Sequence, residues 1–157
     1  MLQPPVYIPH VDLLLQALRI NRERLNSKSK IAIDAKLLRM MLQALAASAP
    51  FSEQFYLATY ADVAEANAAG QIQDLHRHFV ETGFFEGRFG AAPTVDEAYY
   101  TTMYKDVAVA VGRGDVVSGA DHYMRSGASE GRLPSAKMKI EIEAWLGVLR
   151  DETARAS

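Results

Sequence analysis

Apolar residues recur at helical spacing through the first 50 residues of the chain. Spacings of three and four residues place side chains on one side of a helix, so residues 10–26 and 29–48 are each predicted to be helical. Ser29 is expected to cap the second helix, and the segment NSKS to join the two into an αα-hairpin. The apolar stripes are Val11, Leu14, Leu15, Leu18 and Leu25 in the first helix and Leu38, Met41, Leu42 and Leu45 in the second.

The remaining segments also favour helices. Residues 52–60 and 96–104 each place two tyrosines four residues apart. Residues 135–157 fit a final helix, although KIEIE within them alternates as a strand would. No other stretch alternates in this way, which predicts an all-α protein. The final helix is expected to bury Met138, Ile142, Trp145 and Leu149.

The middle of the chain is an internal duplication. Residues 51–88 align with residues 95–132 without a gap when the sequence is shifted by 44 positions. Thirteen of the 38 aligned pairs are identical, whereas unrelated segments would share about two or three. We therefore predict a helical hairpin in residues 1–50, tandem repeats in residues 51–134 and a helix in residues 135–157. The identical pairs are Glu53/Glu97, Tyr56/Tyr100, Tyr60/Tyr104, Asp62/Asp106, Val63/Val107, Ala64/Ala108, Ala66/Ala110, Gly70/Gly114, His78/His122, Gly83/Gly127, Glu86/Glu130, Gly87/Gly131 and Arg88/Arg132.

Each repeat has the features of three short helices. Ser52 and Asp96 are suited to cap the first helix, and an aspartate falls in the first turn of the second. The third helix, in DLHRHFVETG or GADHYMRSG, is expected to turn Phe79 or Tyr123 inward. Glycine tolerates the left-handed conformation that ends a helix, and this is the reason expected for Gly70, Gly83, Gly114 and Gly127.

The tripeptide Glu-Gly-Arg near the end of both repeats is predicted to fold back over the three helices. An arginine can hold a carboxylate with two parallel hydrogen bonds, so its expected partner is the aspartate of the second helix, or a carbonyl at a helix end. Such a clasp would stabilise the repeat, and a ligand-binding role for the same residues is the alternative. The residues concerned are Tyr60, Asp62, Glu86 and Arg88 in the first repeat and Tyr104, Asp106, Glu130 and Arg132 in the second.

The two copies resemble a short bacterial repeat of the form YYL-x-x-YPDV…HY-x-x-x-G-x-x-EGR-x-P. The resemblance is carried by FYLATYADVAEA with HFVETGFFEGRFG and by YYTTMYKDVAVA with HYMRSGASEGRLP, about half of the chain. Ala61 and Lys105 stand where the pattern has proline, and only the second copy has the trailing proline, Pro134. Such repeats occur in tandem beside glycosyltransferase domains and in surface or polysaccharide-associated proteins, which implies a link to polysaccharide biology.

Two functions from different classes fit these observations. One is a non-catalytic interaction or assembly module that binds a protein partner, or a second copy of itself, through Leu14, Leu18 and Met41. The other is a polysaccharide-binding module, in which exposed tyrosine and arginine side chains of the repeats grip a glycan. Either could serve in a surface-attachment or phage-like structure. Tyrosines at helical spacing also suit a hydrophobic core, which favours the assembly module.

Composition and charge narrow the setting. The chain has 157 residues, of which about half are apolar, and no cysteine, which excludes disulfides and thiolate chemistry. The start lacks a signal-peptide pattern and no apolar run is long enough for a membrane span, so we expect a protein made in the cytoplasm. Residues 1–50 hold seven basic and three acidic side chains, a net of +4, and residues 51–157 hold ten and sixteen, a net of −6. This asymmetry suits head-to-tail attraction or an anionic partner.

The sequence contains no motif of an enzyme or a metal site. A nucleophile elbow, a phosphate loop and a metal-ligand cluster are all missing, so we expect no catalysis, cofactor or metal. His76 and His78 face different sides of a helix, and His78 and His122 are expected to form local hydrogen bonds in the repeat cores. Gly114 is explained as a helix cap, which makes the RGD tripeptide around it accidental. Nucleic-acid binding is not expected from a patch as sparse as Arg19, Arg22, Arg24, Lys28 and Lys30.

Overall fold

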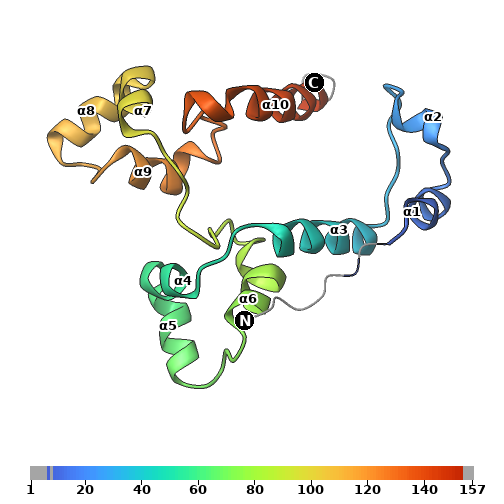
Figure 1. The fold of residues 1–157 in the computed structure, drawn as a ribbon, viewed down its shortest axis with the longest axis horizontal. Coiled ribbons are helices and arrows are strands. Elements are labelled where there is room, and N and C mark those ends of the chain that lie inside the picture. Colours follow the sequence, from blue (N-terminus) through green and yellow to red (C-terminus); the bar gives the residue numbers. More distant parts are fainter. Residues whose placement is uncertain (1–6, 8, 154–157) are drawn as a thin grey trace. The chain divides into compact units, whose positions relative to one another are not determined.

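The computed structural model describes residue 7 and residues 9–153, and from residue 151 onward it describes the backbone alone. All regular secondary structure in this part of the chain is helical, which confirms the predicted all-α class (Figure 1). The chain divides into two compact units, Met1–Ala91 and Ala92–Ser157, so each unit holds one repeat. None of the described helices has both the length and the apolar character needed to cross a bilayer.

Three helices, not two, precede the first repeat in the described part of the chain. They are α1 (Val11–Leu18), α2 (Arg22–Leu25) and α3 (Ala35–Ser48). The single helix predicted for residues 10–26 is wrong, because Arg19 adopts the left-handed conformation, with a φ of 54°, and ends α1. Asn21 then caps α2, and its side-chain oxygen accepts a hydrogen bond from the N–H of Arg24 at 3.0 Å.

The predicted start of the next helix is also wrong. Asp34 caps α3, because its Oδ1 accepts hydrogen bonds from the N–H groups of Lys36 and Leu37 at 2.9 and 3.1 Å. A carboxylate that satisfies two N–H groups of the first turn is a strong helix start. Ser29 instead takes part in a local turn, in which its N–H donates to the hydroxyl of Ser27. The segment NSKS therefore does not join two long helices directly.

The side of α3 that packs into the first unit is lined by alanine. Ala46 is fully buried and belongs to the core of the first repeat, and Ala49 packs against that core. Small side chains allow a close approach between the helix and the repeat. Three members of the predicted apolar stripe lie on the other side of the helix, because Leu38, Met41 and Leu45 are 42, 40 and 51% exposed.

The first repeat consists of three short helices and a π-helical turn. They are α4 (Glu53–Thr59), α5 (Ala61–Ala68), α6 (Leu75–His78) and the turn η1 (Phe79–Gly83). Ser52 caps α4 as predicted, and its hydroxyl accepts from the N–H of Phe55. Gly70 follows α5 in the predicted left-handed conformation, with a φ of 72°. The buried core of this unit comprises Ala46, Tyr56, Val63, Leu75 and Phe79.

The second repeat has the same order of elements. They are α7 (Glu97–Met103), α8 (Lys105–Arg113), α9 (Gly119–His122) and the π-helical turn η2 (Tyr123–Gly127). Asp96 caps α7, and Gly114 ends α8 with a φ of 79°, both as predicted. Tyr100 and Val107 are 0 and 1% exposed. Tyr123, the counterpart of the buried Phe79, is half-buried and packs its ring edge-on against Tyr100.

The backbone closes each repeat in the same way. The N–H of Ser52 donates to the carbonyl of Gly90 at 2.9 Å, which joins the start of the first repeat to a residue two positions after Arg88. The N–H of Asp96 donates to the carbonyl of Pro134 at 3.0 Å. Both members of the second bond lie 44 positions after those of the first.

Two of the repeated glycines have a different reason from the one expected. Gly83 and Gly127 are not in the left-handed conformation. A Cβ atom on Gly83 would lie 2.2 Å from the hydroxyl oxygen of Tyr56, and one on Gly127 would lie 2.1 Å from that of Tyr100. Glycine is required at these positions because a buried tyrosine hydroxyl occupies the space of a side chain.

The C-terminal helix forms where predicted but packs by a different side. It consists of a 3-10 turn, η3 (Ala136–Met138), and α10 (Lys139–Thr153). The predicted buried stripe is wrong, because Met138, Trp145 and Leu149 are 40, 60 and 56% exposed and only Ile142 is half-buried. The packed side includes Leu146, whose Cδ2 lies 2.9 Å from where a Cβ of Gly131 would be.

Candidate functional site

The candidate site is the Glu-Gly-Arg turn that closes each repeat. In the first repeat, Tyr60 alone separates α4 from α5 and has an extended backbone. Tyr104 separates α7 from α8 in the same way. Asp62 and Asp106 follow in the first turn of the second helix. Each sharp junction therefore carries a tyrosine and an aspartate two residues apart.

A π-helical turn and a left-handed glycine bring the arginine back to this junction. The N–H of Phe84 donates to the carbonyl of Phe79 at 2.8 Å, and the N–H of Arg88 to that of Gly83 at 2.9 Å. The first bond has the wide five-residue spacing of a π turn. The second bond, together with that from the N–H of Gly87 to the carbonyl of Phe84 at 3.1 Å, closes a Schellman motif. Gly87 provides the left-handed conformation, with a φ of 77°. The equivalent bonds of the second repeat join Ala128 to Tyr123 and Arg132 to Gly127, at 2.9 and 2.8 Å.

Arg88 holds two carboxylates in the first repeat. Its two terminal nitrogens donate one hydrogen bond each to the two oxygens of Asp62, at 2.9 and 2.7 Å. Its Nε donates to Glu86 at 2.7 Å. The arginine side chain is only 18% exposed. We call this group of three residues the first clasp.

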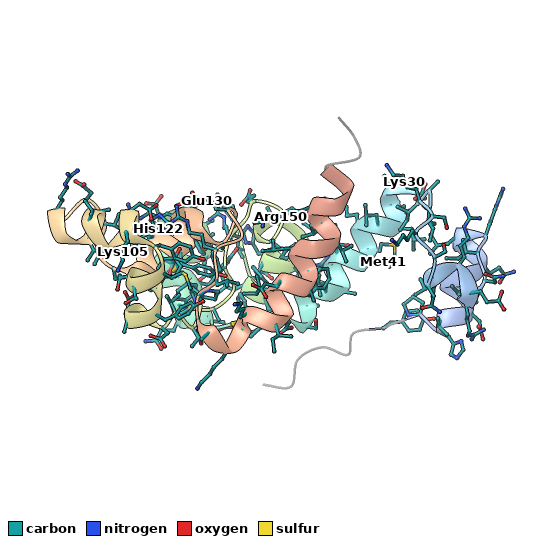
Figure 2. The ribbon with its side chains drawn as sticks, turned by 90° about the horizontal axis from the view of Figure 1, so that it is seen from above. Lys30, Met41, Lys105, His122, Glu130 and Arg150 are labelled. Carbon is teal, nitrogen blue, oxygen red and sulfur yellow. The ribbon has the colours of Figure 1, made fainter. Side chains whose placement is uncertain are left out.

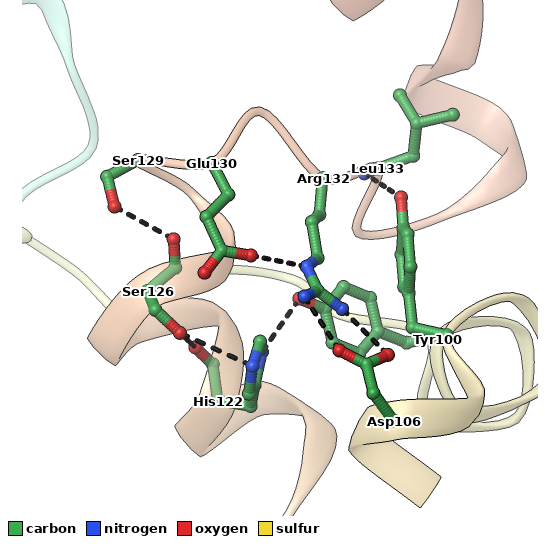
Figure 3. A network of polar contacts seen from close by, with 9 residues as sticks. Tyr100, Asp106, His122, Ser126, Ser129, Glu130, Arg132 and Leu133 are labelled. Atoms are coloured by element: carbon green, nitrogen blue, oxygen red, sulfur yellow. Dashed lines mark hydrogen bonds and ion pairs between the residues drawn. The ribbon is translucent and has the colours of Figure 1, made fainter.

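The second clasp consists of Asp106, Glu130 and Arg132 and has almost the same geometry. The terminal nitrogens of Arg132 donate to the two oxygens of Asp106 at 3.0 and 2.8 Å. Its Nε donates to Glu130 at 2.5 Å, so the guanidinium lies between two carboxylates (Figure 3). Two-pronged pairs of this kind fix orientation as well as contributing energy.

A tyrosine joins each clasp to the turn that follows it. The guanidinium carbon of Arg88 lies 5.0 Å from the ring centre of Tyr60, within the range of a cation–π contact. The hydroxyl of this tyrosine accepts a hydrogen bond from the N–H of Phe89 at 2.7 Å. In the second repeat, the corresponding contacts are those of Tyr104 with Arg132 at 4.8 Å and with the N–H of Leu133 at 2.7 Å.

A tyrosine–histidine pair lies beneath each clasp. The hydroxyl of Tyr56 lies 3.1 Å from Nδ1 of His78, and that of Tyr100 lies 3.1 Å from Nδ1 of His122. Burial raises the pKa of both tyrosines from 10.0 to about 12. The folded state therefore favours the neutral hydroxyl. The stability that depends on the neutral hydroxyls is complete below about pH 10 and is lost as the pH rises towards 12.

The clasps also shift the pKa of their aspartates. Hydrogen bonding to Arg88 lowers the pKa of Asp62 from 3.8 to about 2, and hydrogen bonding to Arg132 lowers the pKa of Asp106. The aspartates in turn raise the pKa of both arginines. The Asp62 side chain is 67% exposed, so water screens the pair and limits its contribution to stability.

The structure places the other predicted site residues away from the clasps. Leu14 and Leu18 lie on α1 and are half-buried. Met41 lies on α3 and is 40% exposed (Figure 2). These three residues belong to the first unit and contribute nothing to the polar network.

A hollow of about 350 Å³ lies beside the second clasp. It is bounded by the clasp on one side and by α10 on the other. Its lining combines an aromatic ring, carboxylates and guanidinium groups, a chemistry that suits a ligand rich in hydroxyl groups. The lining residues are Tyr104, Glu130, Gly131, Arg132, Leu133, Glu143, Leu146 and Arg150.

Sequence reasoning missed two sets of polar contacts. It did not pair the buried tyrosines with His78 and His122, although each pair is separated by 22 residues and recurs 44 positions later. It also missed Glu97, whose carboxylate accepts from the N–H groups of Gly119 and Ala120 at 2.8 Å each. Recurrence at 44 positions was the signal available for the tyrosine–histidine pairs.

Within the described residues, no three His, Asp or Glu side chains lie close enough together to hold a metal ion. Comparisons with family models, with curated proteins and with solved structures find no match to this chain. Its function therefore has to be argued from its own contacts and exposed surfaces.

Proposed function

We propose that this chain is a non-catalytic helical module that assembles with a protein partner. The observation that supports this most directly is the exposed apolar side of α3. Leu38, Met41 and Leu45 are between 40 and 51% exposed and lie three and four residues apart, so they form one continuous surface. Contiguous exposed apolar surface is typical of a protein interface.

The clasps support a structural role for the polar residues of the repeats. The guanidinium groups of Arg88 and Arg132 each donate three hydrogen bonds inside their own repeat. The hydroxyls of Tyr60 and Tyr104 accept backbone bonds. These groups stabilise short helices that have little core of their own, and a ligand would have to compete with those internal contacts. The resemblance to repeats of polysaccharide-associated proteins suggests that the assembly serves polysaccharide or cell-surface biology.

Photo-crosslinking from α3 tests the assembly function. A benzophenone amino acid at position 41 should form a covalent adduct with a protein in the producing cells, because Met41 lies within the proposed interface. The same amino acid at position 117 is a matched control, since Val117 is 82% exposed and lies far along the chain from α3. Adducts from position 41 that are absent from position 117 are the expected result. Adducts that form equally from both positions, or from neither position, would contradict the proposal.

Polysaccharide binding is the second candidate, and the hollow beside the second clasp favours it. Arg150 and Glu143 line the hollow from α10 and are not among the three residues of the clasp. Calorimetry with the polysaccharide of the producing organism should then give saturable heat that Arg150→Ala weakens and Lys105→Ala does not. Lys105 is a suitable control because it is an exposed cation outside the hollow. The absence of heat with the unaltered protein would eliminate this candidate.

A further inference from the structure

The glycine of the second clasp is covered by a helix. Gly131 is half-buried, and a Cβ atom on it would lie 2.9 Å from Cδ2 of Leu146 and 3.5 Å from a terminal nitrogen of Arg150. Leucine and arginine thus approach from successive turns of α10. Gly87, the equivalent glycine of the first clasp, is exposed, and a Cβ atom there would meet no atom of the described residues within 4 Å. The glycine of the first clasp therefore lies open.

The helix that flanks the first repeat packs on a different side of it. Arg39 of α3 donates to the carbonyl of Glu81 at 2.9 Å, and its guanidinium carbon lies 4.1 Å from the ring centre of Phe85. Ala46 of the same helix belongs to the core of the repeat. These contacts involve the core, the π turn and the residues that follow it. In the first unit, α3 therefore does not take the place that α10 has in the second.

The first clasp already has the geometry that receives α10 in the second repeat. Gly87 and Gly131 have φ angles of 77 and 72°. Arg88 and Arg132 form equivalent sets of three hydrogen bonds with their carboxylates. Because the guanidinium already holds both carboxylates, a helix can cover the glycine without rearranging the clasp. A preformed surface of this kind lowers the cost of binding.

The charge of the first clasp favours a cation on an incoming helix. The clasp contains one guanidinium and the two carboxylates of Asp62 and Glu86, so its net charge is −1, and both carboxylates are exposed. In the second unit, α10 supplies Arg150 to the hollow beside the equivalent clasp. Glu143, which lines the same hollow, is paired with Lys139 at 3.9 Å. A basic residue one turn after the leucine therefore complements the clasp.

We propose that the surface around Gly87 binds an amphipathic helix of a protein partner. A leucine of that helix lies on the glycine, and a basic residue one turn later lies beside the clasp. The occupant is inferred from the second repeat, where an identical Glu-Gly-Arg turn carries α10 in this way. The inference rests on the proposed assembly function. It adds a surface to the one on α3 and gives the partner helix the Leu-x-x-x-Arg spacing of residues 146–150.

A synthetic peptide with the sequence of residues 136–153 is the probe. It carries a fluorophore, and its anisotropy is followed as the full-length protein is added. Because the protein's own α10 occupies the second clasp, we expect saturable binding of one peptide per chain. Substitutions are made in the peptide, so the fold of the protein is not at risk. Leu146→Ser in the peptide should weaken binding about tenfold, and Arg150→Glu about fivefold. Val148→Ser is the matched control and should leave binding unchanged, since Val148 is 68% exposed on α10.

Photo-crosslinking locates the bound peptide. A diazirine analogue of leucine at position 146 of the peptide should form adducts within residues 84–89 of the protein, which mass spectrometry identifies. Gly87→Asn in the protein should weaken binding about tenfold. Asparagine tolerates the left-handed conformation but places its side chain where the leucine must lie. Circular dichroism verifies that this variant keeps its helices, and the peptide variants carry the test if it does not.

Three results would overturn the inference. They are the absence of saturable binding, equal losses from the Leu146→Ser and Val148→Ser peptides, and adducts elsewhere on the protein. Adducts within residues 128–133, for example, would mean that the peptide exchanges with the protein's own α10. Each of these results would leave the assembly function standing if position 41 still forms specific adducts with a cellular protein. The absence of those adducts is what would remove the assembly function.

Discussion

The two repeats share their internal polar contacts and differ in the residues that meet the flanking helices. Each has a clasp in which one arginine holds an aspartate through two hydrogen bonds and a glutamate through a third. Each also has a buried tyrosine whose hydroxyl lies 3.1 Å from a half-buried histidine. The residues that make these contacts are identical in the two copies. Duplication has therefore preserved the polar contacts that define the three-helix unit.

The surfaces differ where a flanking helix packs. The first repeat has Phe84 and Phe85 after its π turn, and the guanidinium of Arg39 from α3 lies 4.1 Å from the ring centre of Phe85. The second repeat has Ala128 and Ser129 at these positions. Aromatic residues thus occur in the copy against which α3 packs.

The glycine between the glutamate and the arginine of each clasp is identical in the two copies but has different surroundings. A Cβ on Gly131 would meet Leu146 of α10, whereas a Cβ on Gly87 would have no atom of the described residues within 4 Å. The comparison teaches that the polar contacts inside each repeat use identical residues, whereas the flanking helices contact both a position that the copies share, at Gly131, and positions where they differ, at Phe84 and Phe85.

The largest effect is expected from the glycine beneath each clasp. Gly83→Ala and Gly127→Ala place a methyl group on a fully buried tyrosine, so each should lower the free energy of unfolding by about 3 kcal/mol. Urea unfolding followed by circular dichroism measures this loss. Gly112→Ala is the matched control, because nothing lies within 4 Å of its Cβ position and the first repeat has Ala68 there. It should be neutral or stabilising by up to about 1 kcal/mol. Tolerance of alanine at position 83 would refute the steric explanation.

Much of this interior could be predicted from the sequence, because the two copies reveal which residues act together. The caps Ser52 and Asp96, the left-handed Gly70 and Gly114 and the all-α class follow from local chemistry and periodicity. The close packing of Gly83 on Tyr56 could not be predicted, since it depends on the π turn, which has no recognised sequence pattern here.

The flanks were harder to predict because periodicity indicates an apolar side and not its partner. The stripe of α10 was expected to face the core, yet Trp145 is 60% exposed. In α3 the packed side uses Ala46, a residue too small to stand out among leucines and methionines. Ser29 and Asp34 were both suitable caps, and only the structure shows that the carboxylate satisfies two N–H groups.

A smaller effect is expected where the surfaces differ. Phe85→Ser gives the first repeat the residue of the second and removes the contact with Arg39, at a cost of about 1 kcal/mol. Amide hydrogen exchange in α3 should then become about fivefold faster. The reciprocal change, Ser129→Phe, should alter stability by less than about 0.5 kcal/mol. Equal effects of the two changes would show that Phe85 does not hold α3.

The smallest effect is expected in acid. The folded-state pKa of Asp62 is depressed, so its contribution is complete above about pH 4 and is lost as the pH falls towards 2. The pKa of Asp106 is lowered by the same kind of contact, so the two clasps should weaken together. Urea unfolding at neutral pH and near pH 3 should show a smaller acid loss in Asp62→Asn and in Asp106→Asn than in the unaltered protein. An unchanged acid loss in both variants would mean that other carboxylates dominate.

A double-mutant cycle between Arg132 and Asp106 tests the clasp most directly. Arg132→Met, Asp106→Ala and the double variant are unfolded in urea, and the coupling free energy is obtained from the three changes in stability. A cycle between Arg132 and Asp121 is the control, since Asp121 pairs with Arg125 instead. The account predicts a favourable coupling of about 1 kcal/mol for Arg132 with Asp106 and none for the control. A coupling no larger than that of the control would show that the recurring arginine does not hold its repeat together.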